Sequence, residues 1–536
     1  MQRPDPEAAR LTQAAGTAFQ RRDFETTRQL AQALLLRRPL DPNANQLLGL
    51  VALEQNDPAT AKRHLERANQ AAPGQPAILN SLGVALNRCG DTDAARAMFL
   101  RAGEGGLIDG WRNLGNLEER ALNYDASISA YQRALRIAPN DPASHGALAQ
   151  AYERRHDVTQ ARKHADKALA GDPSNENARL ALAHVLLREK DFAGVEALAA
   201  PVAQRGLLTN QSLAWGVIGE ARDRLDDARG AFAAFTAANR ILRSQHAALL
   251  SASHLLYHPD GVRRMTALAA RADISAWRPP AAFSTPAPAF LVGFPRSGTT
   301  LLDQILSSHS RLVCIEEREH LANALASVIS DREKLAAYAS LSDHDIASVR
   351  EEYWRRVLAE QAPPEGALVV DKLPLNIVIL PLIKRVFPDS KIIFALRDPR
   401  DVILSCYQQR FGMNAAMAQF LDLNAAAAYY DAVMSLMQVC RDRLDLALHQ
   451  VRYEDVVADL EGAARELVAF LEQPFEPAML DFQKTAMARD INTPSARQVV
   501  QPLYTRSIGR WRRYAQDMAP VLPILSAWAE RFGYPS

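Results

Sequence analysis

Small residues recur through the first half of the chain at an almost constant step of about 34 residues. A second small residue follows most of them after twelve more positions, and prolines come at a matching phase. A small side chain lets paired helices approach closely, and a proline ends a helix. The pattern predicts about seven stacked helix pairs over residues 7–242. The first small positions are Ala15, Gly49, Gly83, Gly115, Ala149, Ala183 and Gly216, the second ones include Ala61, Ala95, Ser127, Ala161 and Ala228, and the prolines are Pro39, Pro73, Pro139 and Pro173.

A period near 34 with two helices per unit resembles the tetratricopeptide repeat. The resemblance implies an all-α solenoid that buries its core between neighbouring units and offers a concave groove to a peptide. We therefore expect the repeats to bind a peptide or protein, either an acceptor or a partner. A spacer or a dimerisation arm without a groove ligand is the alternative, and the oligomeric state, a homodimer included, stays open.

Residues 243–288 join the two halves. A helical pattern from Ala247 to Leu256 gives way to a proline-rich stretch that includes Pro279 and Pro280. We interpret this segment as a helical and proline-rich junction that leads into a second domain, residues 289–536.

The second half alternates short apolar runs with helical patterns. Alternation of this kind predicts an α/β domain with a mainly parallel sheet and helices on both faces. Ligands in such folds bind beyond the carboxyl ends of the strands, and four charged residues, Arg296, Glu317, Lys372 and Arg397, follow candidate strand ends. The strand candidates are residues 289–292, 311–314, 367–370, 391–396 and 449–453.

The stretch from Ala289 to His309 has the strand, glycine-bounded turn and helix of a phosphate-binding loop. Its frame, Gly293-x4-Gly298-Thr299-Thr300, is close to a Walker A loop but lacks the lysine before the hydroxyl residue. The cation is Arg296, within the turn. This shift argues against ATP hydrolysis and for another phosphate ligand, held by donors from Ser297, Gly298, Thr299 and Thr300.

A second phosphate motif follows the strand candidate 391–396. Arg397 stands at the turn and Ser405 lies eight residues on, about two helical turns along, so that an arginine and a hydroxyl can hold one phosphate. Together, Pro295 to Thr300 and Arg397-Asp-Pro-Arg-Asp-Val-x-x-Ser405 resemble the sulfotransferase family. The resemblance implies the donor PAPS, with its 5′-phosphosulfate at the first loop and its 3′-phosphate at the second.

Within that family the chain most resembles the protein-tyrosine sulfotransferases. The resemblance implies that Glu317 of Cys-Ile-Glu-Glu317 is the general base, and that Lys372 of Asp-Lys-x-Pro is the catalytic lysine. It also implies that Ser495 lies near the transferred group and that Tyr453 and Arg510 lie at the donor nucleotide. The most direct reading is a PAPS-dependent enzyme acting on tyrosine in a peptide or protein, with the repeats recruiting substrate or partner.

Departures from that pattern leave the acceptor open. Gln409, followed by Arg410, stands where the tyrosine enzymes have a second arginine, and their peptide-binding region is not recognisable here. A carbohydrate, a lipid or a small alcohol is therefore the alternative acceptor. A repeat scaffold with a degenerate nucleotide-binding domain and a P-loop kinase are the competing classes.

Each site residue also has a plainer interpretation. Glu317 belongs to a charged run that is compatible with a solvated helix start. Ser405 is compatible with an ordinary residue of a helix that has no ligand. Lys372 has a neighbouring acid in Asp371, and Arg397 has one in Asp398, so both cations have local structural partners available.

Composition narrows the class of protein. The 536 residues carry a formal net charge of +1, which gives no reason to expect binding to nucleic acid or to a membrane surface. Four scattered cysteines lack metal-ligand spacing and indicate reduced thiols. No apolar run is long enough to span a bilayer, so we expect a cytoplasmic enzyme. We expect no metal, because fixed cations can neutralise the donor.

Overall fold

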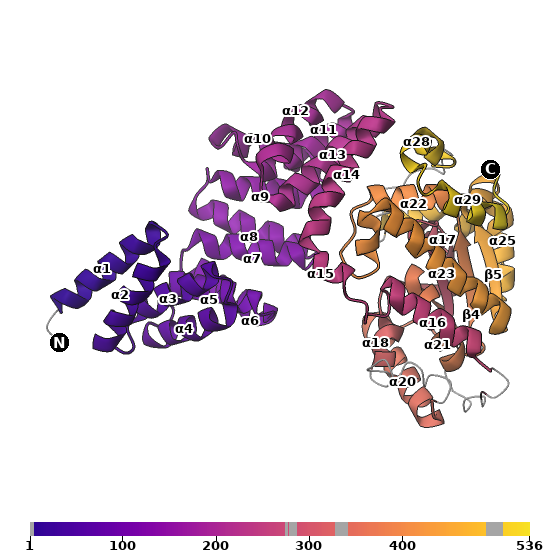
Figure 1. Ribbon diagram of the computed structural model, residues 1–536, viewed down its shortest axis with the longest axis horizontal. Coiled ribbons are helices and arrows are strands. Elements are labelled where there is room, and N and C mark those ends of the chain that lie inside the picture. The colour runs from indigo at the N-terminus through magenta and orange to yellow at the C-terminus, as the bar shows by residue number, and fades with distance from the viewer. Residues whose placement is uncertain (1–4, 274–276, 278–286, 327–340, 489–506, 536) are drawn as a thin grey trace. The chain divides into compact units, whose positions relative to one another are not determined.

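The computed structural model describes residues 5–273, 277, 287–326, 341–488 and 507–535. The chain divides into two compact units, Met1–Arg224 and Leu225–Ser536, and Figure 1 shows a helical first unit and a mixed second one. Among the described residues, no helix is both long enough and apolar enough to cross a membrane.

The described part of the first unit contains only helices. Consecutive helices pack in pairs, from α1 with α2 to α11 with α12, and α13 is the last (Figure 1). Their bounds are α1 Pro6–Gln20, α2 Phe24–Arg37, α3 Pro42–Glu54, α4 Pro58–Ala71, α5 Pro76–Arg88, α6 Thr92–Glu104, α7 Ile108–Arg120, α8 Tyr124–Ile137, α9 Pro142–Arg154, α10 Val158–Gly171, α11 Glu176–Glu189, α12 Phe192–Arg205 and α13 Leu208–Arg224. The predicted solenoid of paired helices is confirmed.

The periodic small residues lie where paired helices touch. A Cβ added to Gly49 would lie 2.5 Å from Leu65 Cγ, and one added to Gly83 would lie 2.6 Å from Phe99 Cε1. Ala149 and Ala183 are fully buried. Gly216 differs, because its Cβ would meet no described atom within 4 Å other than those of its chain neighbours and of its own helix backbone. The last member of the sequence series therefore does not share the packing role of the others.

Aspartates that the sequence pattern did not single out begin the second helices of the pairs. Asp23 accepts a hydrogen bond from the backbone N–H of Thr26, and Asp57 accepts one from Thr60. Asp91, Asp157 and Asp191 cap α6, α10 and α12 in the same way. A carboxylate at this position pairs one of the amides that a helix start leaves without a partner.

The second unit is built on a five-stranded parallel sheet with the order β2-β3-β1-β4-β5. The strands are β1 Ala289–Gly293, β2 Leu312–Glu316, β3 Leu368–Lys372, β4 Lys391–Leu396 and β5 Ala447–Arg452. All five lie at or within three residues of the predicted runs, and the predicted parallel sheet is confirmed. The described helical segments are α14 Ala228–Gln245, α15 Ala247–Leu250, α16 Pro259–Arg271, α17 Thr299–Ser307, α18 His320–Ala326, α20 Asp343–Glu360, η3 Pro374–Ile379, α21 Leu380–Val386, α22 Pro399–Gln408, η4 Met417–Leu421, α23 Leu423–Arg443, α24 Tyr453–Ala458, α25 Leu460–Phe470, η5 Pro477–Asp481, α26 Phe482–Ala488, η6 Arg510–Tyr514, α28 Ala515–Met518 and α29 Leu522–Arg531.

Alternate residues of the central strand β1 serve two separate cores. Phe290 and Val292 join a large cluster with side chains of α20, α22 and α23. Ala289 and Leu291 join a smaller one with α17 and α25. Burial on both faces explains why β1 reads as a continuous apolar run. Polar side chains gather at the carboxyl ends of the strands, where ligands bind in folds of this kind.

The boundary between the units comes earlier than the sequence pattern indicated. The predicted solenoid extended to residue 242, whereas the first compact unit ends at Arg224. Phe235 of α14 and Val262 of α16 are buried in the large core of the second unit. The physical reason is that the apolar faces of α14 and α16 pack against sheet-covering helices, so much of the predicted junction is part of the second domain.

Candidate active site

A tight turn, residues 294–298, connects β1 to α17. Arg296 and Gly298 both adopt positive φ angles, 70° and 99°, and the N–H of Ser297 donates to the carbonyl of Phe294 at 3.1 Å. The first amides of α17 lack helical partners and point out of the helix start, where its dipole favours an anion. Among the described residues, the buried hydroxyl of Ser297 has no hydrogen-bond partner. The turn therefore has the form of an anion cradle.

The two predicted phosphate motifs meet at this turn. Arg296 Nε donates to Ser405 Oγ at 3.0 Å, and Arg397 Nη1 donates to the carbonyl of Arg296 at 3.2 Å. Ser405 lies on α22, and Arg397 follows β4 directly. Because β1 and β4 are neighbours in the sheet, motifs about 100 residues apart in the chain form one site.

Tyr453 lies against both motifs. The Arg397 guanidinium is 5.0 Å from the centre of its ring, and a Cβ added to Gly298 would lie 2.9 Å from its Cδ2. Arg397 Nε is buried and, among the described residues, lacks a hydrogen-bond partner. A partnerless donor on a buried guanidinium, next to an aromatic ring and an anion cradle, fits a phosphorylated nucleotide.

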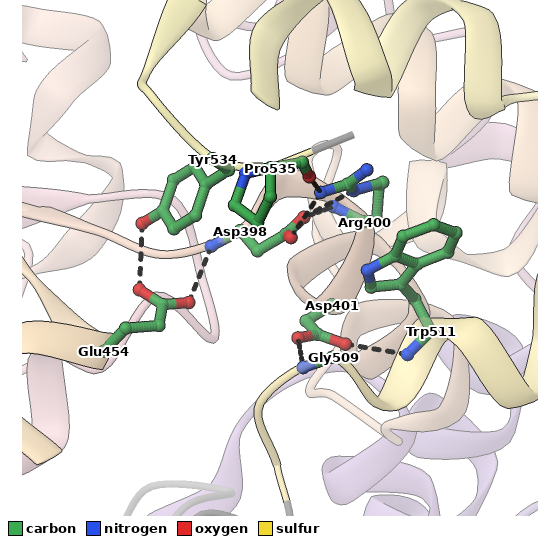
Figure 2. A network of polar contacts seen from close by, with 8 residues as sticks. All are labelled: Asp398, Arg400, Asp401, Glu454, Gly509, Trp511, Tyr534 and Pro535. Carbon is green, nitrogen blue, oxygen red and sulfur yellow. Dashed lines mark hydrogen bonds and ion pairs between the residues drawn. The ribbon is translucent and has the colours of Figure 1, made fainter. Parts of the chain in front are cut away.

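A C-terminal segment, Ser507–Trp511, closes over this part of the site. Arg397 Nη2 donates to the carbonyl of Ser507 at 2.5 Å, and the Tyr453 hydroxyl lies 2.9 Å from Ser507 Oγ. The Asp401 carboxylate accepts from the N–H groups of Gly509 at 2.6 Å and Trp511 at 2.8 Å (Figure 2). Burial raises the pKa of Asp401, and Arg397 opposes that rise. Arg510, at the start of η6, is thereby anchored from both sides.

A buried ion pair involves the acid next to Arg397 in the sequence, and Arg397 takes no part in it. Asp398 pairs with Arg400 at 2.8 Å, and Arg400 also donates to the carbonyl of Pro535 at 2.6 Å (Figure 2). The carboxylate of Glu454 accepts from the Asp398 N–H and from the Tyr534 hydroxyl. The interpretation of Arg397 as the structural partner of Asp398 is therefore wrong, because Arg400 takes that carboxylate.

Lys372 and Glu317 meet at the neighbouring strand ends. Lys372 Nζ lies 3.1 Å from Glu317 Oε1 and 3.3 Å from Glu316 Oε1, and its side chain is fully buried. The N–H of Glu317 donates to the Lys372 carbonyl at 2.8 Å, and Glu317 has a positive φ of 46°. The backbone bond and the turn conformation direct Glu317 toward Lys372, so Glu317 is not part of a solvated helix start.

A third acid, Asp303, which the sequence analysis did not identify, acts on Lys372 together with Glu316 and Glu317. Burial acts to lower the pKa of Lys372, but attraction to Glu317, Asp303 and Glu316 outweighs it, and the pKa is raised. Burial raises the pKa of Glu316, and Lys372 opposes that rise. Asp303 is fully buried on α17. Its burial had no signal in the sequence, because the apolar face of that helix was read from leucines and isoleucines alone.

Asp371 points to the other face of β3 and does not pair with Lys372. Its carboxylate accepts hydrogen bonds from the Tyr353 hydroxyl at 3.1 Å and from Asn376 Nδ2 at 3.2 Å. Burial raises the pKa of Asp371 to about 7, and these two donors oppose the rise. The alternative that Lys372 is a loop cation paired with Asp371 is wrong, because successive strand residues face opposite sides of a sheet.

Two further predicted features have different outcomes. Ser495 lies outside the described residues, so its placement near the transferred group stays a prediction. Gln409 follows α22 and donates from Nε2 to the carbonyl of Arg410.

Among the described residues, no group of three or more His, Cys, Asp or Glu side chains is suited to hold a metal ion.

Comparisons with known protein families support both halves of the resemblance. Residues 288–477 match the sulfotransferase family, and residues 12–76 and 52–104 match the tetratricopeptide repeat. The chain thus has a first part similar to tetratricopeptide repeats and a second part similar to the sulfotransferase family.

Individual relatives cover the second half of the chain. An uncharacterised protein of Aquifex aeolicus is 31% identical over 247 residues, which are 44% of this chain and 32% of that protein. The protein-tyrosine sulfotransferase 1 of Danio rerio is 26% identical over 46% of this chain and 71% of its own length. The protein-tyrosine sulfotransferase of Drosophila melanogaster is 24% identical over 44% and 50%. The match therefore spans from about a third to about seven tenths of these relatives' own lengths.

Among solved structures, the sulfotransferase domain of the Synechococcus PCC 7002 olefin synthase covers 48% of this chain and 99% of its own, with a TM-score of 0.36 and 23% identity.

Proposed function

We propose that this chain transfers a sulfuryl group from PAPS to an acceptor hydroxyl, and that the acceptor is a tyrosine of a peptide or protein. The observation that carries the proposal is the meeting of the two phosphate motifs through the bond from Arg296 to Ser405, beside the pair formed by Lys372 and Glu317. The anion cradle, the second phosphate motif and the pair of Lys372 with Glu317 then lie side by side at the carboxyl ends of neighbouring strands.

The donor nucleotide is assigned to residues around the first turn and α22. Backbone N–H groups and hydroxyls of Ser297, Gly298, Thr299 and Thr300 would hold the 5′-phosphate. Arg397, Ser405, Tyr453 and Arg510 would hold the 3′-phosphate and the nucleoside. Within the described part of the chain, the buried Ser297 hydroxyl and Arg397 Nε have no hydrogen-bond partner, and a phosphate would satisfy both, which supports this assignment.

The transfer step is assigned to Glu317, Lys372 and Arg296. When bound, PAPS supplies the activated sulfuryl group. Arg296 and Lys372 provide fixed positive charge where negative charge develops on the leaving phosphate oxygen. Glu317 accepts the acceptor proton, and Ser495 would contact the transferred group. The raised pKa of Lys372 keeps its ammonium charged at neutral pH.

The tyrosine acceptor is the finer part of the proposal. It is supported by the distant relatives that are named protein-tyrosine sulfotransferases and by acid–base chemistry. A phenol has a pKa near 10, within reach of a carboxylate base, whereas an alcohol is a far weaker acid. The repeats are proposed to recruit the acceptor protein or a partner, as a concave helical array can do.

Transfer of radiolabelled sulfate from PAPS tests the acceptor and the base together. Peptides containing tyrosine, glycans and small alcohols are offered to the wild-type chain and to Glu317→Gln. We expect label on tyrosine and a fall in kcat of about 10²–10⁴-fold in the variant.

Glu319→Gln is the matched control for that experiment, because it removes an exposed carboxylate two residues away. It is expected to keep wild-type kcat. Label on sugars but never on tyrosine would overturn the acceptor, and undiminished activity of Glu317→Gln would remove Glu317 as the base. Calorimetry with adenosine 3′,5′-bisphosphate against ATP tests the donor, and tighter binding of ATP would contradict it.

A further inference from the structure

The helix α14 lies outside the part of the chain that matches the sulfotransferase family, yet it packs directly on the helix that carries Ser405. Ala231 and Phe235 of α14 are buried in the main core of the second unit. The Phe232 ring stacks on Tyr407 of α22, with ring centres 5.1 Å apart and an angle of 23° between the planes. This apolar contact places α14 against the last turn of α22.

Two polar side chains of α14 reach the same residue of α22. Asn239 Nδ2 donates to the backbone carbonyl of Tyr407 at 2.8 Å, and Thr236 Oγ1 lies 2.8 Å from the Tyr407 hydroxyl. Asn239 is 6% exposed. The last carbonyls of a helix have no partner within the helix. The Asn239 amide therefore provides the hydrogen-bond donor that the Tyr407 carbonyl, at the end of α22, does not find in its own helix.

Tyr407 connects these contacts to the donor site. It lies two residues after Ser405, which accepts the hydrogen bond from Arg296. The residue between them, Cys406, donates from Sγ to the carbonyl of Pro295 at 3.4 Å. The last turn of α22 is thus held by the phosphate-binding turn on one side and by α14 on the other.

Flanking ion pairs hold α14 at both of its ends. Arg243 pairs with Asp422 before α23, and Arg513 of η6 pairs with Asp226 at 2.6 Å just before α14. Since η6 begins with Arg510, the second pair also ties the start of α14 to the C-terminal segment over the site. The contacts to Tyr407 and to Arg513 therefore end on α22 and η6, the elements that bear Ser405 and Arg510.

We propose that Asn239 and Thr236 are positioning residues for the donor nucleotide, which act through Tyr407 to fix Ser405 and the last turn of α22. This inference rests on the proposed function, because it takes the site to bind adenosine 3′,5′-bisphosphate and PAPS. It assigns to a helix of the repeat-like part of the sequence a role in donor binding.

The test compares Asn239→Ala and Thr236→Val in the full-length chain with Ser244→Ala, a change of an exposed hydroxyl on the same helix. Calorimetry gives the Kd of adenosine 3′,5′-bisphosphate, and kinetics give the KM of PAPS and of the acceptor separately. We expect the Kd and the KM of PAPS to rise about 3–10-fold in the first two variants, the value of one hydrogen bond. The KM of the acceptor and all constants of Ser244→Ala should not change.

Tyr407→Phe and the double variant with Thr236→Val distinguish loss of the hydrogen bond from loss of folding. The two single changes delete opposite ends of one hydrogen bond, so we expect the double variant to lose no more donor affinity than either single one. Wild-type donor affinity in folded Asn239→Ala and Thr236→Val would overturn the inference, as would equal changes in the KM of donor and acceptor. Failure of the wild-type chain to bind adenosine 3′,5′-bisphosphate would instead overturn the proposed function and this inference with it.

Discussion

Lys372 is a fully buried cation whose burial is compensated by carboxylates from two other elements. Burying an ammonium group costs several kcal/mol unless oppositely charged partners accompany it. Glu316 is the last residue of β2, the neighbour of β3 in the sheet, Glu317 follows it, and Asp303 comes from α17. The cluster therefore holds charge in place before any ligand arrives, which is the condition for electrostatic stabilisation of a transition state.

Replacement of this lysine tests the cluster directly. Lys372→Met keeps the length of the side chain but leaves Glu316 and Glu317 without their cation. We expect kcat to fall about 100-fold or more and stability to fall by at most about 3–5 kcal/mol, because buried Asp303 and the partly buried Glu316 and Glu317 lose their cation. Steady-state kinetics and thermal unfolding measure the two effects.

Lys391→Met is the matched control, since Lys391 is a partly exposed lysine of the adjacent strand β4 that pairs with Glu472 at the surface. Its kcat should stay at the wild-type value. Equal losses in the two variants would show that charge removal as such, rather than the buried cluster, is responsible.

Asp371 links stability to pH. Its pKa is about 7 in the folded chain and 3.8 is its ordinary value, so the folded state binds more protons between these limits. Stability should therefore fall as the pH rises from about 4 to about 7. A shift of this size corresponds to ~4 kcal/mol at most. Asp371→Asn has no charge to bury, so the pH dependence of its thermal midpoint should be flatter in this window.

Asp481→Asn serves as the reference, because that carboxylate is exposed and pairs with Lys484 on the surface. Its midpoint should follow the wild-type pH curve. If the curve of Asp371→Asn also runs parallel to that of the wild type, Asp371 does not titrate between pH 4 and 7.

At the scale of elements, the connection from β1 to α17 determines the donor cradle. The strand is buried on both faces, so its end is fixed, and only the five residues 294–298 separate it from α17. Such a short connection requires backbone conformations that ordinary residues avoid. Gly298 meets this need with a φ of 99° and leaves room for Tyr453, whose ring would touch any added Cβ.

Gly298→Ala tests this geometry. The positive φ costs an alanine about 1–2 kcal/mol, and the Cβ would displace the ring of Tyr453 from the site. We expect the affinity for adenosine 3′,5′-bisphosphate to fall about tenfold or more. Gly412→Ala is the comparison, because its Cβ would meet no described atom within 4 Å. A Gly298→Ala chain with wild-type affinity would show that the turn tolerates a side chain.

At the scale of the whole molecule, the boundary between the two units decides which residues the second unit needs to fold. The sulfotransferase match begins at residue 288, but Phe235, Val262 and Met265 complete the main core of the second unit. Removing buried side chains of this size costs about 2–5 kcal/mol each, which is comparable with the total stability of a domain.

Two fragments test this boundary. A fragment of residues 225–536 is expected to unfold cooperatively and to bind adenosine 3′,5′-bisphosphate. A fragment of residues 289–536, which follows the family match alone, should expose apolar surface and lose that binding. Circular dichroism on heating and calorimetry measure both properties. A shorter fragment that folds and binds like the longer one would show that the second unit does not need α14 and α16.

The sequence alone determined the features that depend on short-range patterns. The 34-residue period predicted paired helices because close helix packing requires small residues at fixed intervals. Continuous apolar runs predicted the inner strands of the sheet, such as β1 and β4. Charged residues after the strand candidates predicted that Arg296, Glu317, Lys372 and Arg397 lie at the carboxyl ends of the strands.

The tertiary structure alone decided which of these groups pair with one another. Lys372 pairs with Glu317 and not with the adjacent Asp371, because neighbouring strand residues face opposite sides while β2 and β3 lie side by side. Asp303 and α14 gave no signal of their roles, since burial and contact between distant segments exist only after the chain has folded.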